Sequence, residues 1–334
     1  MNLTLIIPTK NRHQILKSTL EFYIKNNFTF KILVLDSSDE SELILNKNFI
    51  NKKVNITHLN IKGWTTEVIK KSKKFVNTSY VTYTGDDDIL CVNNVKYFLN
   101  FLKRNKNFSG VHGEAIVANF KKNQLQYTCK YLFNAIKKKK TIERLEEFFD
   151  NYTILMFAIS RKKIFFKAIN LVPNKNIRYK CPDKGICDEV IPCAGLSYFG
   201  RYENIHIPQL VRTVGHTRTD LKKIVDKKSI NYLIQVFENL YYKDTKKNLN
   251  QRLKDKILQK YLNRKIINNK NIFKEILKSI LSFFFLKKFI KKFYVKIMND
   301  RYSKEYILET KNKNYKDFKL ILDDLSFKKR INYE

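Results

Sequence analysis

The chain has 334 residues, of which 43% are hydrophobic and 13% aromatic, a globular composition with room for a full α/β domain and an appendage. Its 66 Lys and Arg against 31 Asp and Glu give a formal net charge of +35, which favours polyanionic partners such as nucleic acid, anionic lipid or phosphorylated substrates. The five cysteines are an odd number and form no Cys-x-x-Cys pair, which favours a reducing compartment.

The first 120 residues alternate between strand and helix patterns. The apolar run 3–7, ended by Pro8, predicts a strand buried on both faces of a sheet. Further strands are predicted at 30–35, 55–59, 80–84 and 110–117, and helices at 15–24, 65–75 and 92–102. This alternation predicts a doubly wound α/β sheet. The absence of the Gly-x-Gly-x-x-Gly and Walker motifs argues against a dinucleotide fold and a P-loop.

Three adjacent carboxylates, Asp86, Asp87 and Asp88, follow the strand at 80–84, with Gly85 able to end that strand. Open α/β sheets bind their ligands at the carboxyl ends of their strands. Because adjacent carboxylates repel one another, a divalent cation with oxygen ligands, Mn²⁺ or Mg²⁺, is the simplest way to hold them together. A solvated acidic turn is the alternative.

Two more motifs precede this triplet at the ends of the first two strands. The first strand leads into Pro8-Thr9-Lys10-Asn11-Arg12, and the second ends in Asp36-Ser37-Ser38. In this order, the three motifs resemble the family-2 type of nucleotide-sugar glycosyltransferases with a GT-A fold. The resemblance covers the first 120 residues and reaches toward residue 220. It implies a doubly wound, Rossmann-like mixed sheet with a nucleoside diphosphate sugar bound across the strand ends.

The resemblance also implies roles for residues of the first two motifs. Pro8, Thr9 and Arg12 would line the nucleotide pocket. Asp36 would accept a hydrogen bond from the base or the ribose. Capping of the helix that follows the second strand is the alternative role for Asp36.

In the aspartate triplet, the resemblance implies a division between nucleotide and metal. Asp86 would face the ribose or the metal, Asp87 would lie on the nucleotide side, and Asp88 would ligate the Mn²⁺ or Mg²⁺ that bridges the diphosphate. Such a metal neutralises charge that grows on the departing diphosphate. The sequence leaves open which aspartate has which role.

An acidic pair, Asp188 and Glu189, precedes an apolar stretch further along the chain. Family-2 enzymes place a general base at this stage, so the resemblance implies that one of the two takes the proton of an acceptor hydroxyl. Asp188 is the first choice, although the Asp-Glu order departs from the Glu-Asp order of the family. The alternative is an acidic pair at a helix N-terminus, stabilised by the helix dipole.

A strand-like run at 210–218 carries Arg212, His216 and Arg218. Some GT-A enzymes use a downstream His as an additional metal ligand and basic side chains on the diphosphate. The resemblance therefore implies that His216 binds the metal and that Arg212 and Arg218 bind the nucleotide sugar. A structural role is the alternative for a lone His.

The sequence predicts a GT-A domain at 1–225 and a helical, basic extension at 226–334. At 272–298, apolar residues recur every three or four positions with lysines between them, and the longest apolar piece is too short to span a bilayer. This pattern predicts a helix on an anionic membrane surface, or one that packs on protein. With no secretory leader before the first strand, we expect a cytoplasmic protein, peripheral on the inner face of the cell membrane.

The resemblance implies metal-dependent, inverting transfer of a sugar from a nucleotide-sugar donor to a hydroxyl of a surface glycan or lipid-linked acceptor. One alternative is a basic nucleic-acid-binding protein, which the lack of zinc-finger, RRM and KH motifs disfavours. Another is a sugar-1-phosphate nucleotidyltransferase, whose glycine-rich phosphate loop is missing near the first strand. A family member that binds the donor without transferring sugar also remains open.

Overall fold

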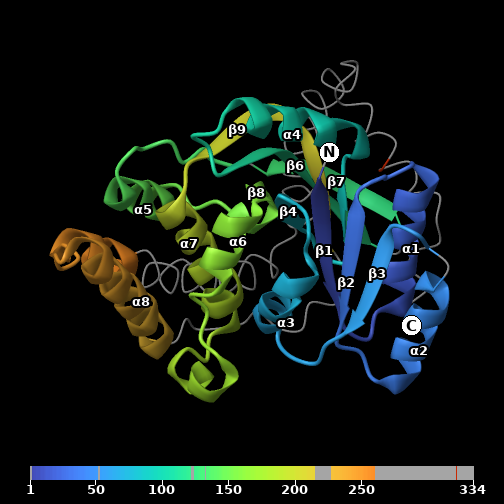
Figure 1. The fold of residues 1–334 in the computed structure, drawn as a ribbon, viewed down its shortest axis with the longest axis horizontal. Coiled ribbons are helices and arrows are strands. Elements are labelled where there is room, and N and C mark those ends of the chain that lie inside the picture. Colours follow the sequence, from blue (N-terminus) through green and yellow to red (C-terminus); the bar gives the residue numbers. More distant parts are fainter. Residues whose placement is uncertain are drawn as a thin grey trace, which may run out of the picture.

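One mixed sheet organises the computed structural model, which describes residues 2–51, 53–121, 124–131, 133–214, 227–259 and 321. Within these ranges nine strands run in the order β3-β2-β1-β4-β8-β6-β9-β5, with β7 paired to β6. The parallel half lies side by side in Figure 1 and contains β1 (Leu3–Thr9), β2 (Lys31–Asp36), β3 (Ile56–Asn60) and β4 (Tyr80–Tyr83). The predicted mixed α/β sheet is confirmed.

Helices connect the parallel strands, as the alternation of patterns predicted. They are α1 (His13–Lys25), α2 (Glu40–Ile50) and α3 (Thr65–Ser72), which runs into the 3₁₀ turn Lys73–Phe75. Leu3, Leu5, Ile6 and Ile7 of β1 are all buried, so layers cover both faces of this strand. Helix α2 was not predicted, because it buries only Asn46 and Ile50 and exposes Ile44 and Leu45, which breaks the amphipathic pattern.

From the end of the aspartate triplet onward, the strands of the second half of the sheet pair in both parallel and antiparallel directions. They are β5 (Asp88–Leu90), β6 (Gly110–Lys121), β7 (Gln124–Tyr131), β8 (Ile159–Arg161) and β9 (Tyr202–Val214). Strand β8 lies antiparallel between β4 and β6, while β9 runs parallel to β6 and antiparallel to β5. The β5–β9 register pairs Asp88 with Arg212, so the topology joins the triplet to a cation from late in the chain.

Several helices and helical turns lie between the strands of this half in the sequence. They are the 3₁₀ turn Val92–Asn94, α4 (Val95–Arg104), α5 (Thr141–Asp150), the 3₁₀ turn Leu155–Phe157, α6 (Lys162–Ile169), the 3₁₀ helix η4 (Lys175–Lys180), the π-helical turn Ile186–Val190, and α7 (Ile191–Phe199). Helix α7 is buried along almost its whole length and contacts both α5 and α6. The π-helical turn therefore extends from a firmly packed helix.

Helix α8 (Lys227–Thr245) begins the predicted extension and packs on the domain through η4 and the π-helical turn. Its Leu233 and Phe237 are buried, and Tyr198 donates a 2.8 Å hydrogen bond to Asp244. The predicted boundary at residue 225 and the amphipathic segment 272–298 lie outside the described residues. No helix in the described ranges is long and apolar enough to cross a membrane.

Candidate active site

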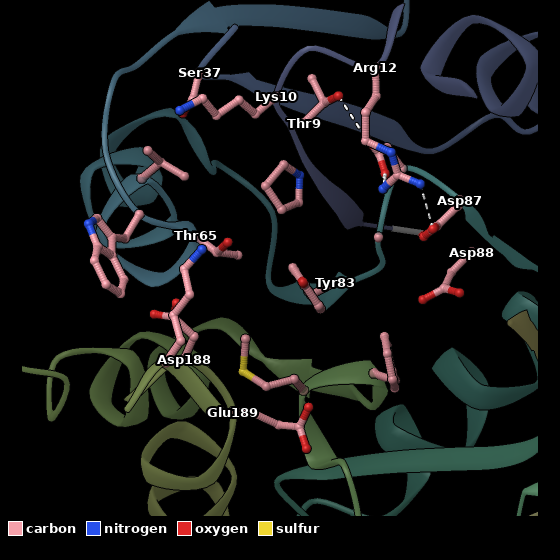
Figure 2. A pocket seen from close by; sticks show the side chains of 18 of the residues that line it. Thr9, Lys10, Arg12, Ser37, Thr65, Tyr83, Asp87, Asp88, Asp188 and Glu189 are labelled. Atoms are coloured by element: carbon pink, nitrogen blue, oxygen red, sulfur yellow. Dashed lines mark hydrogen bonds and ion pairs between the residues drawn. The ribbon is translucent and has the colours of Figure 1, made fainter. Parts of the chain in front are cut away.

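A cavity of about 880 Å³ opens where the parallel strands end and the π-helical turn begins. Its lining brings together segments that are distant in the sequence. Figure 2 shows how the labelled side chains face across it, with one wall formed by Thr9, Arg12, Asp87 and Asp88 and the opposite wall by Asp188 and Glu189. The cavity thus lies at the carboxyl ends of β1 and β4, where an open α/β sheet binds ligands.

The loop after β1 holds the first two aspartates of the triplet. The Arg12 guanidinium donates to Asp86 Oδ1 over 2.6 Å through Nη1 and to Asp87 Oδ2 over 2.7 Å through Nη2. Thr9 Oγ1 donates to Asp86 Oδ2 over 2.7 Å, so both carboxylate oxygens of Asp86 accept hydrogen bonds. This pairing explains how Asp86 is tolerated at 3% exposure.

Asp88 has a different environment at the start of β5. It is 5% exposed, and Arg212 Nε lies 3.7 Å from its Oδ2. Burial, and then the charge of Asp87, raises the pKa of Asp88 above its usual range, against the opposing effect of Arg212. Burial likewise raises the pKa of Asp86 to about 6, although Arg12 lowers it. Negative charge at the triplet is therefore costly at neutral pH, and an added cation would relieve it.

The opposite wall carries the two acidic residues of the π-helical turn. Asp188 Oδ1 accepts a 2.5 Å hydrogen bond from Thr66 Oγ1 and a 2.7 Å hydrogen bond from Arg178 Nη2. Glu189 accepts a hydrogen bond from the Tyr152 hydroxyl. Both carboxylates line the cavity, as expected for residues that could meet an acceptor hydroxyl.

Two solved structures share this arrangement of strands and helices. The crystal structure of S. aureus TarS 1–349 in complex with UDP-GlcNAc matches with a TM-score of 0.53 and 15% identity, over 79% of this chain and 72% of that chain. The complex of the same TarS fragment with UDP gives 0.50 and 15%, over 79% and 71%. The chain has a GT-A fold. No family model and no curated protein matches its sequence.

In this GT-A fold, nearly all of the predicted site residues in the described ranges meet at the cavity. Those that line it are Pro8, Thr9, Arg12, Asp86, Asp87, Asp88, Asp188, Glu189 and Arg212. His216 and Arg218 lie outside the described residues. The predicted roles of these side chains stay predictions, while their convergence on one cavity is a feature of the structure.

Asp36 is the exception, and its predicted hydrogen bond to the base or the ribose stays a prediction. It does not line the cavity, and its side chain is fully buried at the end of β2. Ser38 N donates to its Oδ1 over 2.8 Å, while Asn46 Nδ2 and His58 Nε2 lie 2.8 and 2.9 Å from its Oδ2. The carboxylate therefore joins β2, α2 and β3 within the GT-A domain, and the neighbouring Ser37 is the residue that reaches the cavity.

The described side chains of this GT-A site provide only some of the oxygen ligands that a divalent cation needs. Among the described residues, no three His, Cys, Asp or Glu side chains are grouped to hold a metal. Asp86 already accepts from Thr9 and Arg12, whereas Asp88 is a buried carboxylate at the cavity wall. The residues therefore fit Mg²⁺ or Mn²⁺ that takes one carboxylate from the protein and further oxygens from a diphosphate and water.

Sequence reasoning missed the group that supports Asp188. The Arg178 guanidinium stacks 3.7 Å from the centroid of the Trp64 ring, and Lys184 Nζ lies 5.1 Å from the same centroid. Trp64 is the only tryptophan of the chain and lines the cavity beside Thr65. A lone Trp after Gly63 was the available signal, but nothing in the sequence linked it to Arg178, which lies more than a hundred positions away.

Proposed function

We propose that the protein is a glycosyltransferase that moves a sugar from a nucleoside diphosphate sugar to a hydroxyl of an acceptor. One observation carries the proposal: a single cavity of a GT-A fold has the aspartate triplet on one wall and two carboxylates on the other. The neighbouring fold of TarS holds UDP-GlcNAc in its crystal structure, which supports a nucleotide-sugar donor here.

The donor would lie along the wall formed by the strand ends. Pro8, Thr9 and Ser37 line the part of the cavity at the ends of β1 and β2, where they would contact the nucleoside. Arg212 beside Asp88 places a positive charge where the diphosphate would meet the triplet. A bound Mg²⁺ or Mn²⁺ at Asp88 would supply Lewis-acid stabilisation of the departing diphosphate.

The acceptor would approach from the wall of the π-helical turn. A carboxylate there, Asp188 or Glu189, would take the proton of the acceptor hydroxyl as its oxygen attacks the anomeric carbon. The bond to the diphosphate breaks on the opposite side of the sugar, toward the triplet. Walls that face one another in this way support displacement with inversion.

A surface glycan or a lipid-linked glycan is the proposed acceptor, and the basic extension supports a location at an anionic membrane surface. The net charge of +35 would draw the protein to such a surface from the cytoplasmic side. The same charge leaves nucleic acid as the competing partner.

A thermal-shift panel tests the donor site. UDP-, GDP-, CMP- and dTDP-linked sugars are added with and without Mn²⁺ to the wild type, to Asp88→Ala and to Asp39→Ala as an exposed control. A ligand at a hundred times its Kd stabilises the folded state by about 2.7 kcal/mol. We expect one nucleotide class to raise Tm in a Mn²⁺-dependent way in the wild type and the control, but not in Asp88→Ala. The absence of a shift with every nucleotide would contradict the proposal.

The stereochemical outcome tests the transfer step. Once a donor is identified, the anomeric configuration of the product is read by NMR from coupling constants. We expect inversion, since the two walls present the base and the leaving group on opposite sides of the sugar. A product with the donor's anomeric configuration would exclude a single displacement.

A further inference from the structure

We infer that Arg12 is an internal counter-cation that occupies Asp86 and Asp87, so that Asp88 is the one carboxylate of the triplet presented to a divalent ion. The inference rests on the proposed cation at Asp88. It gives Asp88 a different role from Asp86 and Asp87, and it attributes the difference to Arg12 in the loop after β1.

The geometry of the Arg12 contacts supports this assignment. One guanidinium spans two neighbouring carboxylates, with its Nη1 on Asp86 and its Nη2 on Asp87, at 2.6 and 2.7 Å. Such short, charge-assisted hydrogen bonds are the strong class in proteins. The side chain of Asp86 is only 4% exposed, so water competes little for it. The remaining oxygen of Asp86 accepts from Thr9.

The backbone of the triplet is fixed as well. Thr19 Oγ1 donates to the carbonyl oxygen of Asp86 over 2.7 Å, and Thr213 Oγ1 donates to that of Asp87 over 2.8 Å. Helix α1 and strand β9 thereby hold the turn from two sides. For Asp86 to reach a cation, its contacts with Arg12 and Thr9 would have to break while the backbone stayed in place.

Within the described part of the chain, Asp88 has no contact of this kind. The cation beside it is Arg212, whose Nε lies 3.7 Å from Oδ2, beyond ordinary hydrogen-bond distance. Its side chain is 7% exposed and lines the cavity. A cation at Asp88 would therefore displace no short ion pair, whereas one at Asp86 would compete with Arg12.

This arrangement predicts an unusual effect of removing a positive charge. In Arg12→Met, one opposing charge is lost and two carboxylates are released toward the cavity. A unit charge a few ångströms away changes the free energy of binding by an amount that corresponds to about tenfold in affinity at intermediate dielectric. We expect Mn²⁺ to bind Arg12→Met about tenfold more tightly than the wild type.

The experiment measures free Mn²⁺ by electron paramagnetic resonance during titration of the full chain, first without nucleotide and then with UDP, whose diphosphate can supply further oxygen ligands. The proteins are the wild type, Arg12→Met, Asp86→Asn and Asp88→Asn. Asp86→Asn keeps the shape of the side chain but removes one unit of negative charge near the site, so we expect its Mn²⁺ affinity to fall by no more than about tenfold. Asp88→Asn should lose binding. The double variant Arg12→Met with Asp86→Asn, compared with Asp86→Asn alone, repeats the test of Arg12 without leaving a buried charge unpaired, in case Arg12→Met does not fold.

The outcomes test the role of Arg12 and the cation site separately. Tighter binding when Arg12 is removed, in either background, together with binding by Asp86→Asn that is weakened but retained, supports the inference. Loss of binding in Asp86→Asn equal to that in Asp88→Asn, or weaker binding without Arg12, overturns it and leaves the cation site standing. No Mn²⁺ binding by any of the proteins would overturn both the cation site and the inference.

Discussion

Arg178 donates a 2.7 Å hydrogen bond to Asp188 from a side chain that is only 8% exposed. The same guanidinium stacks on Trp64, and Thr66 donates to the same oxygen of Asp188. Three segments therefore meet on one carboxylate oxygen: the start of α3, the 3₁₀ helix η4, and the π-helical turn. This contact fixes the wall of the cavity that faces the aspartate triplet.

Removal of Arg178 should disturb this wall severely. Arg178→Met leaves Asp188 as a poorly compensated charge, for which breaking a buried ion pair costs about 3 kcal/mol or more. We expect a clear fall in the midpoint of urea unfolding, and a smaller fall in Asp188→Asn, which keeps an oxygen acceptor. Arg201→Met is the matched control, because Arg201 donates to the Lys137 carbonyl at an exposed position. Additive effects in the double variant Arg178→Met with Asp188→Asn would contradict direct coupling.

The two carboxylates of the π-helical turn should differ in their effect on turnover. A general base contributes about 10²- to 10⁴-fold to the rate, so Asp188→Asn should lower kcat by that range with the donor KM nearly unchanged. We expect Glu189→Gln to lower kcat much less. Tyr152→Phe removes the hydroxyl that donates to Glu189, and its kcat is measured for comparison with that of Glu189→Gln. If Glu189→Gln shows the larger loss, the two roles are exchanged.

The stability of the protein should depend on pH through Asp36. Burial by itself raises the pKa of this carboxyl, but hydrogen bonds from His58, Ser38 and Asn46 outweigh it and leave the pKa below its ordinary value. A depressed pKa means that the folded state binds fewer protons than the unfolded state. Asp36 therefore contributes stability above the unfolded value of about 3.9, and this contribution is lost as the pH falls through the folded pKa.

Asp36→Asn should accordingly destabilise the protein by about 1 to 3 kcal/mol at pH 7, since an amide replaces one acceptor with a donor. The difference from the wild type should shrink as the pH falls below about 4. Urea unfolding between pH 3 and pH 7 measures it, with the exposed Asp39→Asn as the control. A difference that is constant over this range would show that the charge of Asp36 is not responsible.

Membrane attachment should depend on the lysines of the segment 272–298. Each lysine near an anionic surface contributes about 1 kcal/mol. Replacement of Lys287, Lys288, Lys291 and Lys292 by serine in the full chain should therefore release most of the protein from vesicles that contain phosphatidylserine. Replacement of four lysines at 137–140 is the control with equal charge change. Equal binding of both variants would indicate general charge attraction instead of a defined segment.

Local patterns in the sequence predicted the parallel half of the sheet because β1 and β2 are short, buried apolar runs and the shorter β3 and β4 alternate with helical patterns. The strand 3–7 and the helix 15–24 match β1 and α1 closely. Helix α2 escaped prediction because its exposed apolar side chains hide its periodicity. The long β6 and β9 pair could not be foreseen, since pairing between distant strands depends on the whole topology.

For the site, sequence order identified the residues at the strand ends but not their contacts. Asp36 and Ser37 are neighbours, and only the pleat of β2 decides which of them faces the cavity. The role of Arg178 depends on a stacking contact with Trp64, and no spacing rule connects the two. The pairing of Arg12 with two aspartates likewise needs the three-dimensional path of the loop after β1.

The hydrogen bond from Thr213 to the carbonyl of Asp87 joins residues 126 positions apart. A ribosome that adds about 5 to 20 residues per second would need roughly 6 to 25 s to synthesise the chain between them. Throughout that interval the nascent protein carries the triplet without β9 and without Arg212. The early strands can assemble first, but the cavity is completed only when translation has passed residue 213. A truncated product of translation would thus keep much of the parallel sheet and lack the wall of the cavity that carries Arg212 and Thr213.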